Sequence, residues 1–207
     1  MTEEEFREYL ALGRESRGVE FKGPGSRTDK HFFARVVRAV IGMANRRDGG
    51  VVILGVEEHA GVLNPVGLSR EQLGTWNRYD HVAQALGNYT DPSVDFGVEV
   101  VHFEGDQFIV LRVAEFEEWP VLCAGEFQGQ GQGRSQDVLR RGALYLRGRR
   151  SIETAEIPSL EELRELLELA TEKQLRRFLS TAQRVGLRVE PQPLDDDLFR
   201  EQTGDLE

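Results

Sequence analysis

The spacing of apolar residues along the chain follows two different periods. In some segments apolar residues recur every three or four positions, the period of an amphipathic α-helix, and elsewhere they alternate or form short continuous runs, as in β-strands. We therefore predict helices over residues 2–13, 30–45 and 69–89, and one or two helices over residues 159–186. Strands are predicted over residues 18–22, 51–56, 94–103, 107–116 and 138–148. The predicted fold class is α+β, a mixed β-sheet with flanking helices, followed by a C-terminal helix and an acidic tail.

Local signals support several of these elements. The predicted helices that begin near Thr2, Ser69 and Ser159 each carry Glu or Gln three positions later, the spacing of a capping box. Residues 51–56 form a continuous apolar run, as expected for a central strand that is buried on both faces. Residues 125–137 are rich in Gly and Gln, so we predict a mobile loop that could close over a ligand.

A change of composition near Pro158 divides the chain. We predict a core domain over residues 1–157, a helical appendage over residues 158–189 and a disordered acidic tail over residues 190–207. From Ser159 onward the chain has 12 acidic and 7 basic residues, so this last quarter carries half of the formal net charge of -10. Such a balance argues against a protein that coats nucleic acid nonspecifically, because phosphate binding needs clustered cations.

Length and composition limit the class of protein. The chain has 207 residues, 39% of them hydrophobic, which is enough for a substantial core. It has no apolar run of membrane-spanning length, and its acidic N-terminus is unlike a signal peptide, so we expect a cytoplasmic protein with no membrane contact. The single cysteine, Cys123, excludes an intrachain disulfide and fits a reducing compartment, and the four histidines have no zinc-ligand spacing.

One stretch of the chain is strongly basic. Residues 134–150 contain six arginines: Arg134, Arg140, Arg141, Arg147, Arg149 and Arg150. They could form a surface that contacts nucleic-acid phosphates. They could equally be a solvated strand edge whose charges discourage aggregation.

A second candidate site lies near the N-terminus, in the stretch "ESRGVEFKG". Within the predicted strand, alternation places Val19 and Phe21 toward the core and Glu20 and Lys22 together on the opposite face. A carboxylate beside an ammonium group can be a catalytic pair or a surface ion pair. Glu15 precedes this strand by a few residues and is a second carboxylate that could be catalytic or merely structural.

The order of these motifs resembles that of a known family. "GRESRGVEFK", a helix that ends in "AN", "DGGVVILGVEE", "WPV" and "GALYLRGRRS" occur in the order and rough spacing of the Schlafen core domain of the AlbA type. The resemblance covers approximately residues 8–157. The combination of "ESxxVEFK" with "ANxxxGGxxxxGV" is more specific than either motif alone.

The resemblance implies two possible activities. Some family members are described only as nucleic-acid-binding or ATP-binding proteins, whereas animal Schlafens cleave structured RNA, including tRNA, with three acidic residues and a divalent metal. Carried over by position, these acids are Glu15, Glu20 and Glu58, with Mg or Mn as the metal. The third position is an aspartate in the family and a glutamate here. Lys22 could neutralise charge in the transition state.

Three functions therefore remain open. The first is a metal-dependent endoribonuclease that acts on structured, tRNA-like RNA in a toxin or antiphage setting, and the second is a noncatalytic nucleic-acid-binding module. The third is an assembly subunit that docks a protein partner through residues 159–189. The sequence contains no GxxxxGK[ST] motif, so no P-loop nucleotide site is expected. Because the chain has one copy of a lobe that animal Schlafens carry twice, the resemblance also implies a homodimer.

Overall fold

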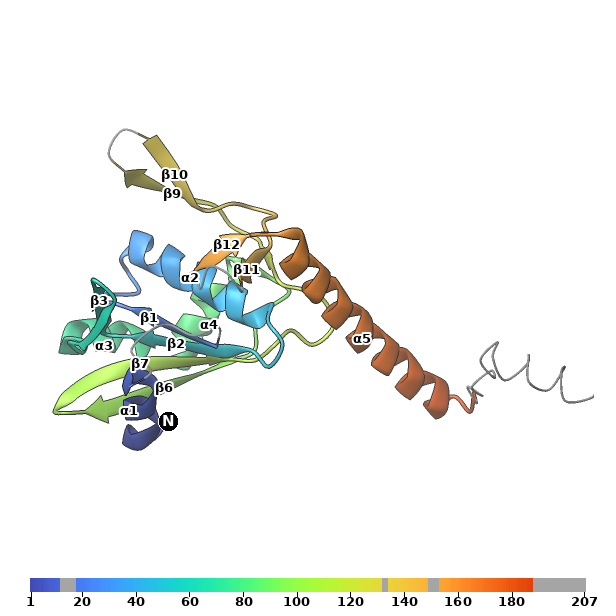
Figure 1. Cartoon of the computed structure of the whole chain (residues 1–207), viewed down its shortest axis with the longest axis horizontal. Coiled ribbons are helices and arrows are strands. Elements are labelled where there is room, and N and C mark those ends of the chain that lie inside the picture. The colour runs from blue at the N-terminus through green and yellow to red at the C-terminus, as the bar shows by residue number, and fades with distance from the viewer. Residues whose placement is uncertain (12–17, 132–133, 149–152, 188–207) are drawn as a thin grey trace, which may run out of the picture. The chain divides into compact units, whose positions relative to one another are not determined.

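A computed structural model describes residues 1–11, 18–131, 134–148 and 153–187 of the chain (Figure 1). Within these ranges, residues 130, 131 and 134–137 are described by their backbone alone. The largest sheet has four strands in the order β1-β2-β7-β6. Their bounds are β1 Val19–Lys22, β2 Gly50–Leu54, β7 Asp106–Val113 and β6 Phe96–Phe103. β1 and β2 are parallel and the other pairs are antiparallel, which confirms the predicted mixed sheet in an α+β fold.

Helices cover both faces of this sheet. α1 (Glu3–Ala11) lies on one face and α2 (Lys30–Ala44) on the other, as Figure 1 shows. Alternation along β2 places Val51 and Ile53 in the core cluster that includes Phe6 of α1, and its other side chains in the cluster around α2. The central strand is thus buried on both faces, as its continuous apolar run predicts.

Four short antiparallel pairs surround the sheet. They are β3 (Val56–His59) with β4 (Val62–Pro65), β5 (Thr90–Asp91) with β8 (Leu122–Cys123), β9 (Phe127–Gly131) with β10 (Arg134–Leu139), and β11 (Tyr145–Arg147) with β12 (Thr154–Glu156). The β9–β10 and β11–β12 pairs differ from the elements predicted for these residues. The predicted loop over residues 125–137 is wrong, because β9 and β10 form a hairpin there. The predicted last strand over residues 138–148 is divided between β10 and β11, and β12 follows it.

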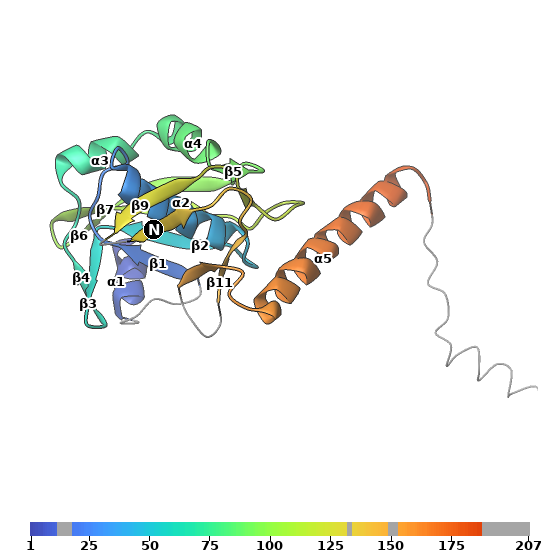
Figure 2. The same ribbon diagram turned by 90° about the horizontal axis from the view of Figure 1, so that it is seen from above.

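The segment predicted as one helix over residues 69–89 contains two helices. These are α3 (Arg70–Trp76) and α4 (Tyr79–Gly87), which Figure 2 shows separately. The predicted capping box at Ser69 is present. At the break, Arg78 has an extended backbone. The Arg27 side chain donates to the carbonyl of Thr75 at 2.8 Å and so satisfies an acceptor at the end of α3.

Asn45 ends α2 and connects it to two other segments. Its side-chain amide donates to the carbonyls of Val121 (2.8 Å) and Tyr145 (3.2 Å), and its side-chain oxygen accepts from the backbone N–H of Val121 (2.7 Å). Asn45 is buried, so these three bonds satisfy polar groups that water does not reach. The end of α2 is therefore fixed against the chain that leads into β11.

The last described element is α5 (Leu160–Arg184), a continuous helix of 25 residues. The chain divides into two compact units, residues 1–170 and 171–207, so α5 begins in the first unit and ends in the second. Leu166 and Leu169 of its first half are buried in the core cluster around α2. None of the helices within the described ranges combines the length and the apolar character needed to span a bilayer.

Candidate functional site

Glu20 lies on the face of the sheet that α2 covers. The neighbouring residues Val19 and Phe21 point to the core cluster on the α1 side, so alternation turns Glu20 and Lys22 to the α2 side together, as predicted. This face is covered rather than wet. Glu20 is 5% exposed and the side chain of Lys22 is 19% exposed.

Both oxygens of the Glu20 carboxylate have partners. Oε1 forms a close ion pair with the ammonium group of Lys22. Oε2 accepts a hydrogen bond from Nη1 of Arg147 at 2.5 Å and another from the hydroxyl of Thr154 at 3.0 Å. The burial of this carboxylate is thereby compensated by two cations and a hydroxyl group.

Arg147 reaches Glu20 from β11. Its residue is 3% exposed, and its Nη2 also donates to the carbonyl of Val19 at 2.8 Å. The guanidinium group thus connects β11 to β1 through a side chain and a backbone carbonyl. Arg147 is therefore a buried partner of the Glu20 carboxylate and does not form part of a solvated strand edge.

Arg38 of α2 adds a further cation beside this cluster. Its Nη2 donates to the carbonyl of Thr154, and its guanidinium carbon lies 5.4 Å from the centre of the Tyr145 ring. Its Nε is buried and, within the described part of the chain, has no hydrogen-bond partner. Burial raises the pKa of the Tyr145 hydroxyl, which accepts the backbone N–H of Arg140 at 2.9 Å.

Glu20, Lys22, Arg38 and Thr154 line a pocket of about 350 Å³. Its charged lining side chains are three glutamates and three cations: Glu20, Glu58, Glu153, Lys22, Arg35 and Arg38. Glu58 belongs to β3, where alternation sends it into the pocket. Its neighbour Glu57 pairs instead with His59 at 3.0 Å. Glu20 and Glu58, two of the acids that the family resemblance singles out, therefore share one pocket with Lys22.

The described residues do not by themselves complete a metal site. Among them, no three Asp, Glu, His or Cys side chains lie close enough together to hold a metal ion. Glu20 and Glu58 could supply two carboxylate ligands from one pocket, although Glu20 already accepts from two cations. Glu15, the third predicted ligand, lies outside the described residues.

The other arginines of the basic stretch are placed differently from one another. Arg140 is exposed and pairs with Glu156 of β12. Arg141 is exposed in the turn between β10 and β11. Arg149 and Arg150 lie outside the described residues, and the side chain of Arg134 is not described.

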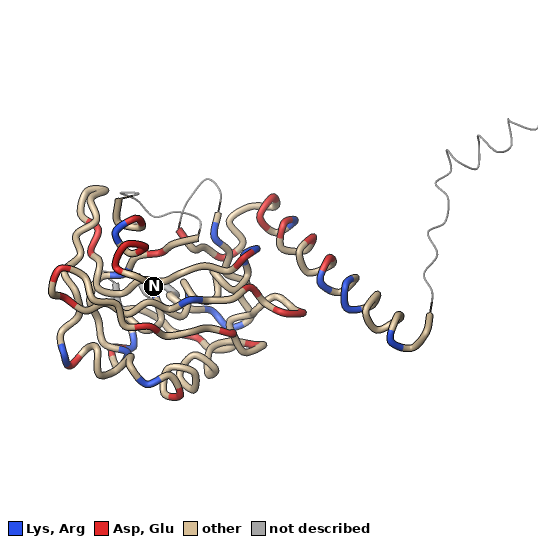
Figure 3. Tube along the Cα trace, turned by 90° about the horizontal axis from the view of Figure 1, so that it is seen from below, with Lys and Arg blue, Asp and Glu red and all other residues tan. Residues whose placement is uncertain are grey.

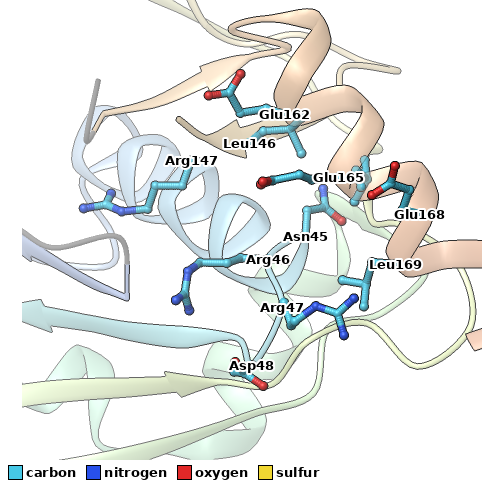
Figure 4. A pocket seen from close by; sticks show the side chains of 11 residues that line it. Asn45, Arg46, Arg47, Asp48, Leu146, Arg147, Glu162, Glu165, Glu168 and Leu169 are labelled. Atoms are coloured by element: carbon cyan, nitrogen blue, oxygen red, sulfur yellow. The ribbon is translucent and has the colours of Figure 1, made fainter. Parts of the chain in front are cut away.

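A second pocket lies between the end of α2 and the start of α5 (Figure 4). Its volume is about 400 Å³, and Arg46 and Arg47 line it together with Glu165 and other side chains of α5. Arg147 lines it as well, and Figure 4 shows its guanidinium group directed away from the α5 glutamates. Arg147 therefore belongs both to the lining of this pocket and to the cluster around Glu20.

Two cations of the Glu20 pocket, Arg35 and Arg38 of α2, were not predicted from the sequence. Arg35 and Arg38 are three positions apart, so they lie on the same side of the helix. They interrupt an otherwise apolar segment of the sequence, and this interruption could have identified them. A charged pair on a helix with apolar residues over most of its surface is a candidate for a pocket wall.

Two solved structures are similar to this chain. The DIP2311 protein from Corynebacterium diphtheriae aligns at 18% sequence identity with a TM-score of 0.44, covering 73% of this chain and 25% of that protein. This chain therefore spans about a quarter of the length of that relative. The N-terminal domain of a putative ATP-dependent DNA helicase RecG-related protein from Nitrosomonas europaea aligns at 22% identity with a TM-score of 0.46, covering 68% and 88% of the two chains.

A comparison with curated proteins found no match. The family comparison is more informative, because the model of the family described as "Schlafen, AlbA_2" matches residues 15–155, which is more than half of the chain. The residues that line the Glu20 pocket, from Glu20 to Thr154, all lie within this matched region. The chain belongs to the Schlafen AlbA_2 family.

Proposed function

We propose that this domain is a divalent-metal-dependent endoribonuclease that acts on structured RNA, with the Glu20 pocket as its cleavage site. The observation that carries the proposal is the convergence of Glu20, Lys22 and Glu58 on one pocket that Arg35 and Arg38 of α2 also line. The register of β3 supports it, because Glu58 and not Glu57 faces this pocket.

The residues of the pocket have distinct roles in this proposal. Arg35 and Arg38 hold the phosphate of the RNA backbone, since guanidinium groups bind phosphate oxygens through paired hydrogen bonds. Lys22 stabilises the negative charge that develops on that phosphate. Glu20 and Glu58, together with Glu15, would hold Mg²⁺ or Mn²⁺ as carboxylate ligands. A divalent metal held there would supply Lewis-acid chemistry toward a phosphoryl oxygen during attack by a ribose hydroxyl or water.

The charges of the pocket fit this assignment. Its three glutamates balance its three cations, so the pocket alone offers little net attraction to a phosphodiester. A bound divalent cation adds two positive charges and shifts the balance toward phosphate binding. RNA binding to this pocket should therefore be tighter with the metal than without it.

A second candidate function is noncatalytic nucleic-acid binding. It is favoured by the ion pairs of Glu20, whose two oxygens already contact Lys22 and Arg147. A carboxylate compensated in this way can serve only to stabilise the fold, while Arg35 and Arg38 bind phosphate without cleavage. The two functions differ in whether RNA is cleaved and in whether Glu58 matters.

The experiment that separates them uses a labelled tRNA pool. The wild-type chain is incubated with it in Mn²⁺, in Mg²⁺ or with a chelator, beside the variants Glu58→Gln and Glu57→Gln. We expect metal-dependent cleavage that falls by about 100-fold or more in Glu58→Gln, the scale seen when a charge-stabilising group is lost. Glu57→Gln is the matched control, because it removes the same charge one residue away on the other side of β3.

Two outcomes would contradict the proposal. If the wild-type chain binds RNA but cleaves none with any divalent metal, noncatalytic binding is the better account. If cleavage depends on Glu57 and not on Glu58, the pocket around Glu20 is not the cleavage site.

A further inference from the structure

α5 carries an exposed apolar stripe along its length. Leu160 is 80% exposed, Leu167 55%, Phe178 60% and Val185 67%. Val185 follows the last residue of the helix, and its backbone N–H donates to the carbonyl of Thr181, so it continues the helical spacing. Large apolar side chains aligned on one face indicate an interaction surface.

This stripe is separate from the face of α5 that packs on the core. Leu166 and Leu169 are buried in the core cluster around α2. At about 100° per residue, their directions on the helix lie far from the common direction of Leu160 and Leu167. Leu160 and Leu167 therefore lie on a different side of α5 from Leu166 and Leu169.

The spacing of the stripe is symmetric about one point of the helix. The pairs Leu160 with Val185 and Leu167 with Phe178 are both centred between Glu172 and Lys173. In an antiparallel pair of identical helices with a two-fold axis at this point, each residue faces the other member of its pair. Leu160 thus meets Val185, and Leu167 meets Phe178.

The charges of α5 select the same orientation. Residues 160–172 contain five acidic residues and one basic residue, whereas residues 173–184 contain four basic residues and none that is acidic. Figure 3 shows this change from acidic to basic along the helix. A parallel pair would bring halves of the same sign together, and an antiparallel pair brings opposite signs together.

We propose that α5 pairs with α5 of a second copy of this chain in antiparallel orientation, with the two-fold axis between Glu172 and Lys173. The surface lies outside residues 15–155, the region that the family model matches, and the proposal does not depend on the proposed cleavage activity. The contact is confined to one helix from each copy. We therefore expect weak self-association, with a dissociation constant on the order of 10 to 100 μM.

Sedimentation of the full chain over a range of concentrations tests the pairing. The average mass should rise from 23.4 kDa toward twice that value, and Phe178→Glu should raise the dissociation constant by about 10-fold or more. Gln183→Glu is the matched control, because it adds the same charge to an exposed site of the same half, outside the stripe. A monomeric mass throughout, or an equal effect of both substitutions, would overturn the proposal.

Thiol cross-linking tests the orientation. The chain has one cysteine, Cys123, which is buried and whose thiol pKa is raised by that burial, so an introduced surface cysteine reacts selectively. Leu160→Cys and Val185→Cys chains should form a mixed disulfide when combined and little dimer when oxidised separately. In the antiparallel pair the two copies of residue 160 lie about 37 Å apart. Efficient dimers of Leu160→Cys with itself would refute the antiparallel arrangement.

Discussion

The side chain of Arg147 neutralises a carboxylate that would otherwise be buried with Lys22 as its one cation. Glu20 and Arg147 are each at most 5% exposed, and the bond between them is part of a cluster that includes Thr154 and the carbonyl of Val19. Removing one member of a buried pair is costly because the other keeps its charge without compensation. The role of Arg147 at this scale is therefore to hold Glu20 in place.

Replacing Arg147 tests this role. We expect Arg147→Met to lower the free energy of unfolding by about 3 to 5 kcal/mol, because the methionine keeps bulk but leaves the buried Glu20 carboxylate with Lys22 as its one cation. The double variant Glu20→Gln with Arg147→Met should recover part of that loss. Urea unfolding measures both. Arg141→Met, at an exposed site, is the control and should change the free energy by at most about 0.5 kcal/mol; a similar loss there would argue against the pair.

The sequence allowed part of this arrangement to be predicted. Alternation along β1 correctly places Glu20 and Lys22 on one face. It cannot show that this face is covered, because the covering residues Arg147 and Thr154 come from strands more than 120 residues later. Charge clustering around Arg147 indicates a surface, and a single buried arginine within such a cluster has no local signature. The contribution of Glu15 stays a prediction.

Individual elements are held to one another by a few buried polar side chains, and Asn45 is the clearest case. It ends α2 and binds the backbone at Val121 and Tyr145, so one amide connects a helix to two separate strand regions. The amide group satisfies both a donor and two acceptors there. An aliphatic side chain of similar size cannot do so.

Replacing Asn45 should loosen this junction. Asn45→Ala leaves the N–H of Val121 and two carbonyls without their partner, so we expect a loss of about 2 to 4 kcal/mol in the free energy of unfolding. Asn88 is a matched control, since it ends α4 in the same way but is exposed. Asn88→Ala should cost at most about 0.5 kcal/mol. Thermal and urea unfolding of both variants give the comparison, and equal losses would contradict the role of Asn45.

Elements with a strong apolar period were predictable, and those defined by tertiary contacts were not. α1, α2 and the β6–β7 pair follow directly from their patterns. The β9–β10 hairpin was missed because its Gly and Gln residues have low strand propensity, which the pairing of the two strands overrides. The break between α3 and α4 was missed because the apolar period continues through Arg78, while the carbonyl of Thr75 is bound by a residue from another part of the chain.

For the molecule as a whole, the distribution of charge decides which surface can meet nucleic acid. The chain carries a formal net charge of -10, so nonspecific attraction to phosphate is weak. Arg35 and Arg38 supply two cations to the lining of the Glu20 pocket, in which three glutamates balance three cations. Binding should therefore depend on these particular cations and not on the overall charge.

Salt dependence measures this contribution. Arg35 is exposed and lines the pocket, so Arg35→Ala should reduce the slope of log affinity against log salt by about 0.7 to 0.9, the change expected for one phosphate contact. The measurement uses RNA with a chelator present, so that cleavage does not interfere. Arg164→Ala removes an exposed arginine of α5 that does not line this pocket, and its slope should stay unchanged. Identical slopes for the wild type and Arg35→Ala would exclude a phosphate contact at this position.

The distance along the chain between Glu20 and Arg147 also bears on how the protein is made. The two residues are 127 positions apart, so during synthesis Glu20 leaves the ribosome long before its partner exists. Until β11 and β12 emerge, the Glu20 carboxylate cannot accept the hydrogen bond from Arg147 and remains hydrated. Contacts that close such long loops form late in folding. An incomplete nascent chain therefore lacks the assembled pocket, and the site forms when nearly the whole family domain has been translated.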